Sequence, residues 1–269
     1  MGLLYFFDKV VKPKMLKGTR MLNPADTGVL ENGISCIRQG DVNLWFYTKD
    51  GKTLAVDAGH ITEKNIDEDF KKINIDPNEI HHVLLTHADV DHCGGIDKNA
   101  KRYIYPNAKI YISKKEEPYL NRTLHRMIKL GLKIYNCVEL KEGYITLKDG
   151  ETLDLDGFKV KCILVPGHTI GHMCYIVDDK ILFSGDCLAV NKDGGYAFWD
   201  FFCQYPELNK KALHHLRDEV LHSNIEGVCT GHSGYINDIE NLFSHMDISA
   251  QFKGKVPFDE TAPDDVCKR

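Results

Sequence analysis

The chain has 269 residues, of which 43% are hydrophobic, so it is long enough to bury a large core. Its formal net charge of −5 argues against a nucleic-acid partner, because phosphate contacts need a basic surface. Its nine cysteines are irregularly spaced and form no Cys-x-x-Cys pair, which predicts reduced thiols in a cytoplasmic protein rather than a disulfide framework.

The N-terminal segment carries a short apolar run that ends at Phe7, directly before the charges of Asp8 and Lys9. This run is too short for a membrane span. We expect its aromatic side chains to pack on the body of the protein or at a contact between two copies, so a homodimer is one of two expectations.

The apolar patterns predict a mixed α/β chain. In chain order, they predict strands over residues 33–38, 42–48 and 53–56, a helix over 62–72, strands over 81–85 and 109–112, a helix over 113–130, strands over 151–155, 159–165, 173–177 and 180–183, a helix over 207–222, a strand before His232 and a helix over 236–251. Asp50-Gly51 and Asp178-Asp179 predict tight hairpin turns, and Thr62 is a candidate N-cap. Residues 253–269 predict a polar tail.

The predicted helix over residues 113–130 carries several basic side chains. They are Arg122, His125, Arg126 and Lys129. They are expected to form its solvent-exposed side or, alternatively, to face an anionic substrate.

The segment after the strand at residues 81–85 is rich in metal-ligand residues. Within six positions it holds His87, Asp89, Asp91 and His92. Imidazole and carboxylate together suit zinc, iron and manganese. A strand that ends in such a loop can direct several side chains at one point.

The same arrangement of a strand, a glycine and a ligand residue occurs three more times. His168 follows Pro166-Gly167, Asp186 follows Gly185, and His232 follows Gly231. Glycine lets the backbone turn sharply and approach a bound ion closely. The repetition predicts a centre for two metal ions.

These motifs, together with the strand that ends at Asp57-Ala58-Gly59, resemble the metallo-β-lactamase fold over about residues 34 to 245. The resemblance implies a four-layer αββα sandwich in a single domain over residues 1–269, with an N-terminal extension over 1–30 and the tail at its end. It also implies two sets of ligands. The first cation position would take His87, Asp89 and His168, the second would take Asp91, His92 and His232, and Asp186 would bridge them. Asp57 resembles a buried aspartate that holds a ligand in place.

Asp89 departs from the family pattern. Most hydrolases of the family have histidine at this position, and the di-iron branch that handles oxygen and nitric oxide has glutamate. A carboxylate moves the preference from zinc toward iron and manganese. We therefore expect two divalent cations, with zinc first and iron or manganese as alternatives.

The leading functional hypothesis is a hydrolase that acts on a small-molecule substrate. A hydroxide bound by two metals would cleave an ester, thioester, lactone, amide or phosphodiester bond. We expect Asp91 to serve catalysis as well as metal binding, and His172 to donate a proton to the leaving group or to be purely structural. The alternative is a non-haem di-iron protein that binds or reduces dioxygen or nitric oxide, and a third possibility is a binding protein with an empty or half-filled site.

Aromatic residues gather between Asp186 and the helix at 207–222. They are Tyr196, Phe198, Trp199, Phe201, Phe202 and Tyr205. They are expected to wall a substrate pocket, to fill the core or to form a contact between subunits.

Overall fold

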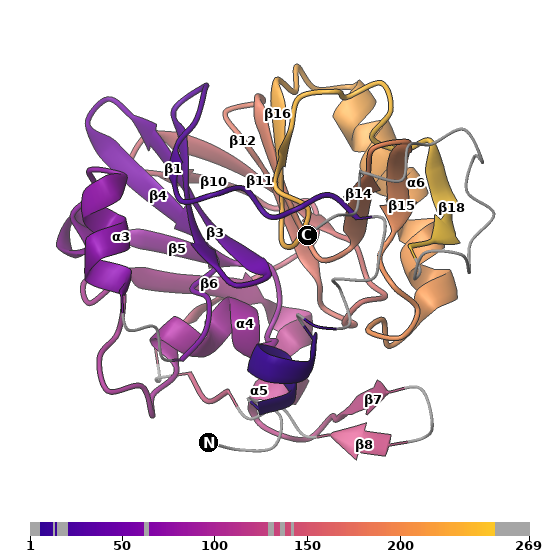
Figure 1. The fold of residues 1–269 in the computed structure, drawn as a ribbon, viewed down its shortest axis with the longest axis horizontal. Coiled ribbons are helices and arrows are strands. Elements are labelled where there is room, and N and C mark those ends of the chain that lie inside the picture. Colours follow the sequence, from indigo (N-terminus) through magenta and orange to yellow (C-terminus); the bar gives the residue numbers. More distant parts are fainter. Residues whose placement is uncertain are drawn as a thin grey trace.

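Two β-sheets pack face to face in the computed structural model, and helices cover both outer faces (Figure 1). The structure describes residues 6–12, 14, 21–61, 65–128, 132–134, 138–140 and 143–250. Their arrangement confirms the predicted four-layer αββα sandwich.

The first sheet has seven strands. They are β1 (Gly28–Val29), β2 (Ile34–Gln39), β3 (Val42–Lys49), β4 (Lys52–Val56), β5 (His82–Leu85), β6 (Lys109–Ser113) and β9 (Ile145–Leu147), in this spatial order. The first four are antiparallel, and the pairs from β4 onward are parallel. Asp50 and Gly51 have φ of 51° and 74°, the left-handed backbone that a tight hairpin turn requires.

The second sheet has six strands. They are β10 (Thr152–Leu155), β11 (Phe158–Leu164), β12 (Met173–Val177), β13 (Ile181–Gly185), β16 (Gly227–Thr230) and β17 (Tyr235–Ile236). β13 and β16 pair in parallel, and the other neighbours pair antiparallel. Asp178 and Asp179, at φ of 53° and 60°, form the predicted hairpin turn.

The remaining elements lie around the sheets. The longer helices are α3 (Ile66–Lys72) and α6 (Pro206–Leu221), and the short helical turns are η1 (Phe7–Val11), η2 (Pro77–Glu79), α4 (Val90–Cys93), η3 (Gly94–Ile96), η4 (Lys114–Glu116) and α5 (Glu117–Leu120). A small sheet contains β14 (Leu188–Asn191), β15 (Gly194–Ala197) and β18 (His245–Ser249), and a two-stranded ribbon contains β7 (Arg126–Ile128) and β8 (Leu132–Ile134). No helix in the described ranges is long and apolar enough to cross a lipid bilayer.

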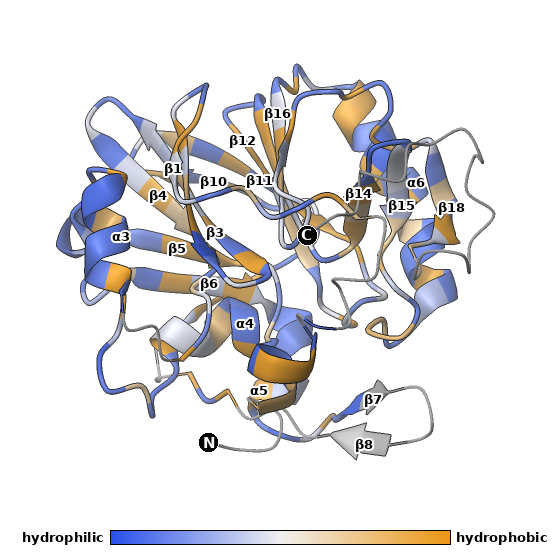
Figure 2. Cartoon of the chain, in the orientation of Figure 1, coloured by the Kyte–Doolittle hydropathy of each residue, from blue (hydrophilic) through white to orange (hydrophobic). Residues whose placement is uncertain are grey.

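Apolar side chains fill the space between the two sheets. Trp45, Tyr175 and Phe183 are among the fully buried members of this core. Two further clusters lie on the outer faces, one under α3 and one under α6. The ribbon of α6 shows hydrophobic and hydrophilic stretches in Figure 2, as expected for a helix that covers a sheet.

The predicted helix over residues 113–130 is wrong beyond Leu120. Arg122 has a φ of 61°, which ends the helical path, and Asn121 Oδ1 accepts a hydrogen bond from Thr123 N at 3.0 Å. The chain then enters the β7–β8 ribbon. Arg122, His125 and Arg126 therefore do not form one face of a helix, and Lys129 lies outside the described residues.

The predicted helix over residues 236–251 is also wrong. Asp238 accepts hydrogen bonds from Asn241, which makes a turn, and β18 then pairs with β15 in parallel. Pairing with the edge strand β15 therefore decides the conformation of this segment, although the spacing of its apolar residues fits a helix. The N-cap predicted at Thr62 and the tail over 253–269 lie outside the described residues.

The core between the sheets predicts a large effect of Phe183→Ala. Phe183 is fully buried on β13, and its truncation would leave a cavity between the two sheets. We expect a loss of about 3–5 kcal/mol in the free energy of unfolding, measured by urea denaturation. Leu221→Ala, at a side chain that is 71% exposed, is the matched control and should change it by about 0.5 kcal/mol or less.

Candidate metal centre

Seven candidate donor side chains meet where four strands end. The strands are β5 of the first sheet and β11, β13 and β16 of the second, and the donors that follow them are His87, Asp89, Asp91, His92, His168, Asp186 and His232. β13 and β16 are parallel neighbours, so Asp186 and His232 emerge at the same edge. The structure thus brings together every ligand residue that the sequence predicts, from both halves of the sandwich.

Asp186 lies at the middle of this group. Its Oδ1 is 3.2 Å from His92 Nε2, and its Oδ2 is 3.1 Å from His232 Nε2. The same Oδ2 is 3.6 Å from His168 Nε2 and 4.0 Å from His87 Nε2. One carboxylate therefore faces all four imidazoles, as a bridging ligand would.

The donor atoms fit divalent cations. In each predicted ligand set, they lie within 4.8 Å of one another. Among the described residues, His87 Nε2 is buried without a hydrogen-bond partner, and the buried His92 Nε2 and Asp186 Oδ1 lie 3.2 Å apart without forming a hydrogen bond. An orphaned polar atom of this kind costs about 1–3 kcal/mol, and a zinc-type cation with nitrogen and oxygen ligands would satisfy all three.

Asp57 and Thr86 fix the orientation of two imidazoles. Asp57 Oδ2 is 2.8 Å from His92 Nδ1, and Thr86 donates its backbone N–H to Asp57 Oδ1 at 2.8 Å. Thr86 Oγ1 is 3.0 Å from His87 Nδ1. Both rings consequently turn their Nε2 atoms toward the centre. Asp57 has a φ of 62°, so local backbone strain accompanies this arrangement.

His172 lies behind Asp186. Its Nε2 accepts a hydrogen bond from the backbone N–H of Asp186 at 3.0 Å, and its side chain is fully buried. Burial lowers the pKa of His172 to about 4, so the ring is neutral near pH 7. Of the two roles considered for His172, this geometry favours the structural one.

The model of the metallo-beta-lactamase superfamily matches residues 37–232, which include all seven donors. The chain belongs to the metallo-beta-lactamase superfamily.

Curated relatives of this superfamily chain carry hydrolase names. The chain is 30% identical over 172 residues to the "probable polyketide biosynthesis zinc-dependent hydrolase PksB" of Bacillus subtilis (strain 168), an alignment that covers 62% of this chain and 64% of PksB. It is 26% identical over 194 residues to a hydroxyacylglutathione hydrolase of Serratia proteamaculans (strain 568), covering 69% of this chain and 65% of the relative. The chain thus spans just under two thirds of the length of each.

Solved structures show the same fold. The BLEG-1 B3 metallo-beta-lactamase is 21% identical with a TM-score of 0.57, and the alignment covers 79% of this chain and 97% of BLEG-1. A metallo-beta-lactamase family protein of Thermus thermophilus is 18% identical with a TM-score of 0.56, covering 78% of this chain and 77% of that protein.

Arg126 is paired with Asp89, the residue that departs from the pattern of the superfamily. Arg126 Nη2 is 2.8 Å from Asp89 Oδ2, and the guanidinium also donates to the carbonyl oxygens of His168 and Phe202. Burial alone raises the pKa of Asp89, but Arg126 and the nearby imidazoles outweigh it and hold the pKa well below its usual range. Asp89 is therefore a carboxylate whose charge is already compensated. No local pattern in the sequence pointed to this pair, because Arg126 was expected on a helix face.

Two further ionisable residues, Glu116 and Lys12, contact the ligand loops, and neither was predicted from the sequence. Glu116 accepts hydrogen bonds from the backbone N–H groups of Ala88, at 2.8 Å, and Gly171, at 2.9 Å, and so ties two ligand loops together. Lys12 contacts Asp91 Oδ2 from the N-terminal side. A buried charge at a distant position has no local sequence signal, although the spacing of Asp8 and Lys12 fits an i,i+4 pair.

The aromatic segment divides between two of its three predicted roles. Phe198 lies against the rings of His168 and His232, with centroid distances of 5.3 and 5.7 Å, so it walls the centre. Phe198 and Trp199 are both buried in one small core cluster, and Trp199 stacks on Phe202. Phe198 is thus the member of this cluster that borders the donors.

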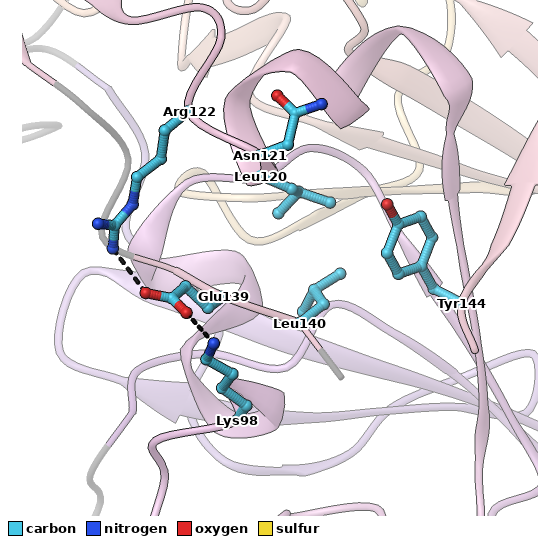
Figure 3. A pocket seen from close by; sticks show the side chains of 7 residues that line it. All are labelled: Lys98, Leu120, Asn121, Arg122, Glu139, Leu140 and Tyr144. Carbon is cyan, nitrogen blue, oxygen red and sulfur yellow. Dashed lines mark hydrogen bonds and ion pairs between the residues drawn. The ribbon is translucent and has the colours of Figure 1, made fainter. Parts of the chain in front are cut away.

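A separate surface pocket offers different chemistry. Figure 3 shows its lining residues, in which Glu139 is held by both Lys98 and Arg122. The carboxylate is fully compensated, and none of the seven donors lines this pocket. The metal centre therefore remains the candidate site.

The pKa of Glu116 predicts a pH-dependent stability. Burial raises this pKa from 4.5 to about 7, so the folded protein keeps a proton that the unfolded chain releases between these pH values. The contribution of Glu116 is present below pH 4.5 and is lost as the pH rises to about 7. Relative to Glu116→Gln, the free energy of unfolding of the metal-free wild type should fall across this window. Urea denaturation at several pH values tests this, with the exposed Glu79→Gln as control, and a constant difference would contradict it.

The close approach of Gly231 predicts that its replacement weakens metal binding. A Cβ at this position would lie 2.0 Å from Asp186 Oδ1 and 3.0 Å from His92 Cε1. Gly231→Ala should displace the carboxylate and lower zinc affinity by roughly 10–100-fold in calorimetric titration. Gly28→Ala, where the nearest atom is 3.9 Å away, should leave affinity unchanged.

Proposed function

We propose that this chain is a metal-dependent hydrolase whose centre holds two divalent cations, with zinc as the first candidate. The observation that carries this proposal is the convergence of seven donors from four strand ends, with Asp186 facing all four imidazoles. The relatives named as zinc-dependent hydrolase and hydroxyacylglutathione hydrolase support the reaction class.

The proposed ligands divide into the two predicted sets. His87, Asp89 and His168 would hold one cation, and Asp91, His92 and His232 would hold the other, with Asp186 between them. Cations bound here would supply Lewis acidity and a water nucleophile of lowered pKa. No serine or cysteine nucleophile is then required.

Substrate would approach on the side of Asp89. Its side chain is 24% exposed, whereas those of the other six donors are at most 4% exposed. Arg126 flanks this side with a side chain that is 15% exposed, so a polar group of the substrate would lie near its guanidinium. We propose a small thioester as the substrate, with an ester or lactone as the next candidates.

The proton for the leaving group does not come from His172 in this proposal. Its Nε2 already accepts the Asp186 N–H, and its lowered pKa leaves the acidic imidazolium form unpopulated at neutral pH. His172 instead positions the backbone of the proposed bridging ligand. Solvent that enters past the partly exposed Asp89 would supply this proton instead.

A substrate screen tests the proposed function. Zinc-loaded protein should hydrolyse a member of a panel of hydroxyacylglutathione, simple thioesters, esters, lactones, amides and phosphodiesters, and chelation should abolish the activity. Asp186→Asn should lower kcat/KM by roughly 100-fold or more, because the donors lose their shared partner. Asp26→Asn, at a side chain that is 92% exposed, is the control.

Two results would contradict this function. One is hydrolysis that survives chelation. The other is a metal-loaded protein that leaves the whole panel intact and holds iron with an oxygen-dependent absorption band, which would support the di-iron alternative based on Asp89.

A further inference from the structure

The N-terminal turn η1 inserts a lysine into the metal centre. η1 contacts α4, which carries Asp91 and His92, and the two lie near each other in Figure 1. Lys12 directly follows η1, and its side chain is only 8% exposed. Its Nζ contacts Asp91 Oδ2 and lies 2.7 Å from Asp8 Oδ1 and 3.7 Å from Asp41 Oδ2.

Lys12 contacts Asp91 Oδ2, the same oxygen that lies near the two imidazoles of the second ligand set. Asp91 Oδ2 is 3.3 Å from His232 Nε2 and 3.5 Å from His92 Nε2, so it is the oxygen that points toward the other donors. An ammonium on this oxygen and a dication ligated by it would be close neighbours. Their repulsion is strong in a site shielded from water. Arg126 contacts Asp89 of the first set in the same way, but the Asp89 side chain is 24% exposed against 4% for Asp91, so water screens the repulsion in the first set.

Carboxylate oxygens surround the Lys12 ammonium. Those of Asp8 and Asp41 lie within 3.7 Å of its Nζ, and Asp91 Oδ2 contacts it directly. Three buried carboxylates together form a binding site for a cation, and here the ammonium group of Lys12 occupies that site.

A second contact fastens η1 in this place. Asp8 Oδ2 lies 3.0 Å from His60 Nδ1, and both side chains are at most 7% exposed. Asp8 therefore links Lys12 on one side with the loop after β4 on the other. Two buried polar contacts, of Lys12 with Asp91 and of Asp8 with His60, make this a specific docking site for the N-terminal segment.

We propose that Lys12 takes the place of the second cation: the docked turn η1 leaves one tightly held cation with the first ligand set, and a second cation binds only when Lys12 withdraws from Asp91. This inference rests on the proposed metal centre and adds control of its loading by the chain's own N-terminal segment. Loading of the second position and release of η1 are then the same event.

Zinc content tests this exchange without an activity assay. After dialysis against limiting zinc, wild type should retain about one zinc per chain and Lys12→Met about two, because methionine keeps the apolar stem and removes the charge. Calorimetric titration should show the second zinc binding roughly tenfold or more tightly to Lys12→Met. Lys14→Met, at an exposed lysine two residues later, is the matched control and should behave as wild type.

A measurement on the wild type covers the case in which Lys12→Met fails to fold. Hydrogen exchange of residues 6–12 should rise when zinc exceeds one equivalent, because the second ion displaces η1. Unchanged exchange with two zinc ions bound would overturn the proposal, as would two equally tight zinc ions in wild type and Lys12→Met alike. Those results leave the hydrolase proposal intact, whereas absence of bound metal in every variant overturns both.

Discussion

The contact of Asp186 with four imidazoles is the interaction on which the centre depends. The carboxylate emerges from β13 at Gly185, which has a φ of 51°, and His172 holds its backbone N–H from behind. Gly231 leaves the space that its Oδ1 occupies. The packed sheets below fix where β13 and β16 end, so the core sets the spacing of the donors.

Charge compensation from distant segments is the second constraint. The loop after β5 adds two carboxylates to a buried site, and each has a basic partner, Arg126 for Asp89 and Lys12 for Asp91. The Asp89–Arg126 pair carries the same net charge as the neutral histidine found at this position in most hydrolases that the chain resembles. The aspartate at position 89 therefore leaves the net charge of the centre nearly unchanged relative to a histidine there.

The sequence predicted what local patterns encode. Apolar runs followed by glycine located the strand ends, and Asp50-Gly51 and Asp178-Asp179 located the hairpins because their backbone conformations are specific. It could not predict the partners of the donors. Lys12 is 79 residues from Asp91 and Arg126 is 37 from Asp89, so only the fold brings each pair together. Similarly, the apolar spacing over residues 236–251 fits a helix, and only the presence of β15 makes a strand there.

The donors come from both sheets, and this has a mechanical consequence. Asp91 and His92 extend from the first sheet, whereas Asp186 and His232 extend from the second. Ions held between them would act as a cross-link that fastens the two halves of the sandwich at one end. The free energy of unfolding of the chain would then rise with the free concentration of its metal. The folded protein would consequently last longer when the metal is plentiful than when it is scarce.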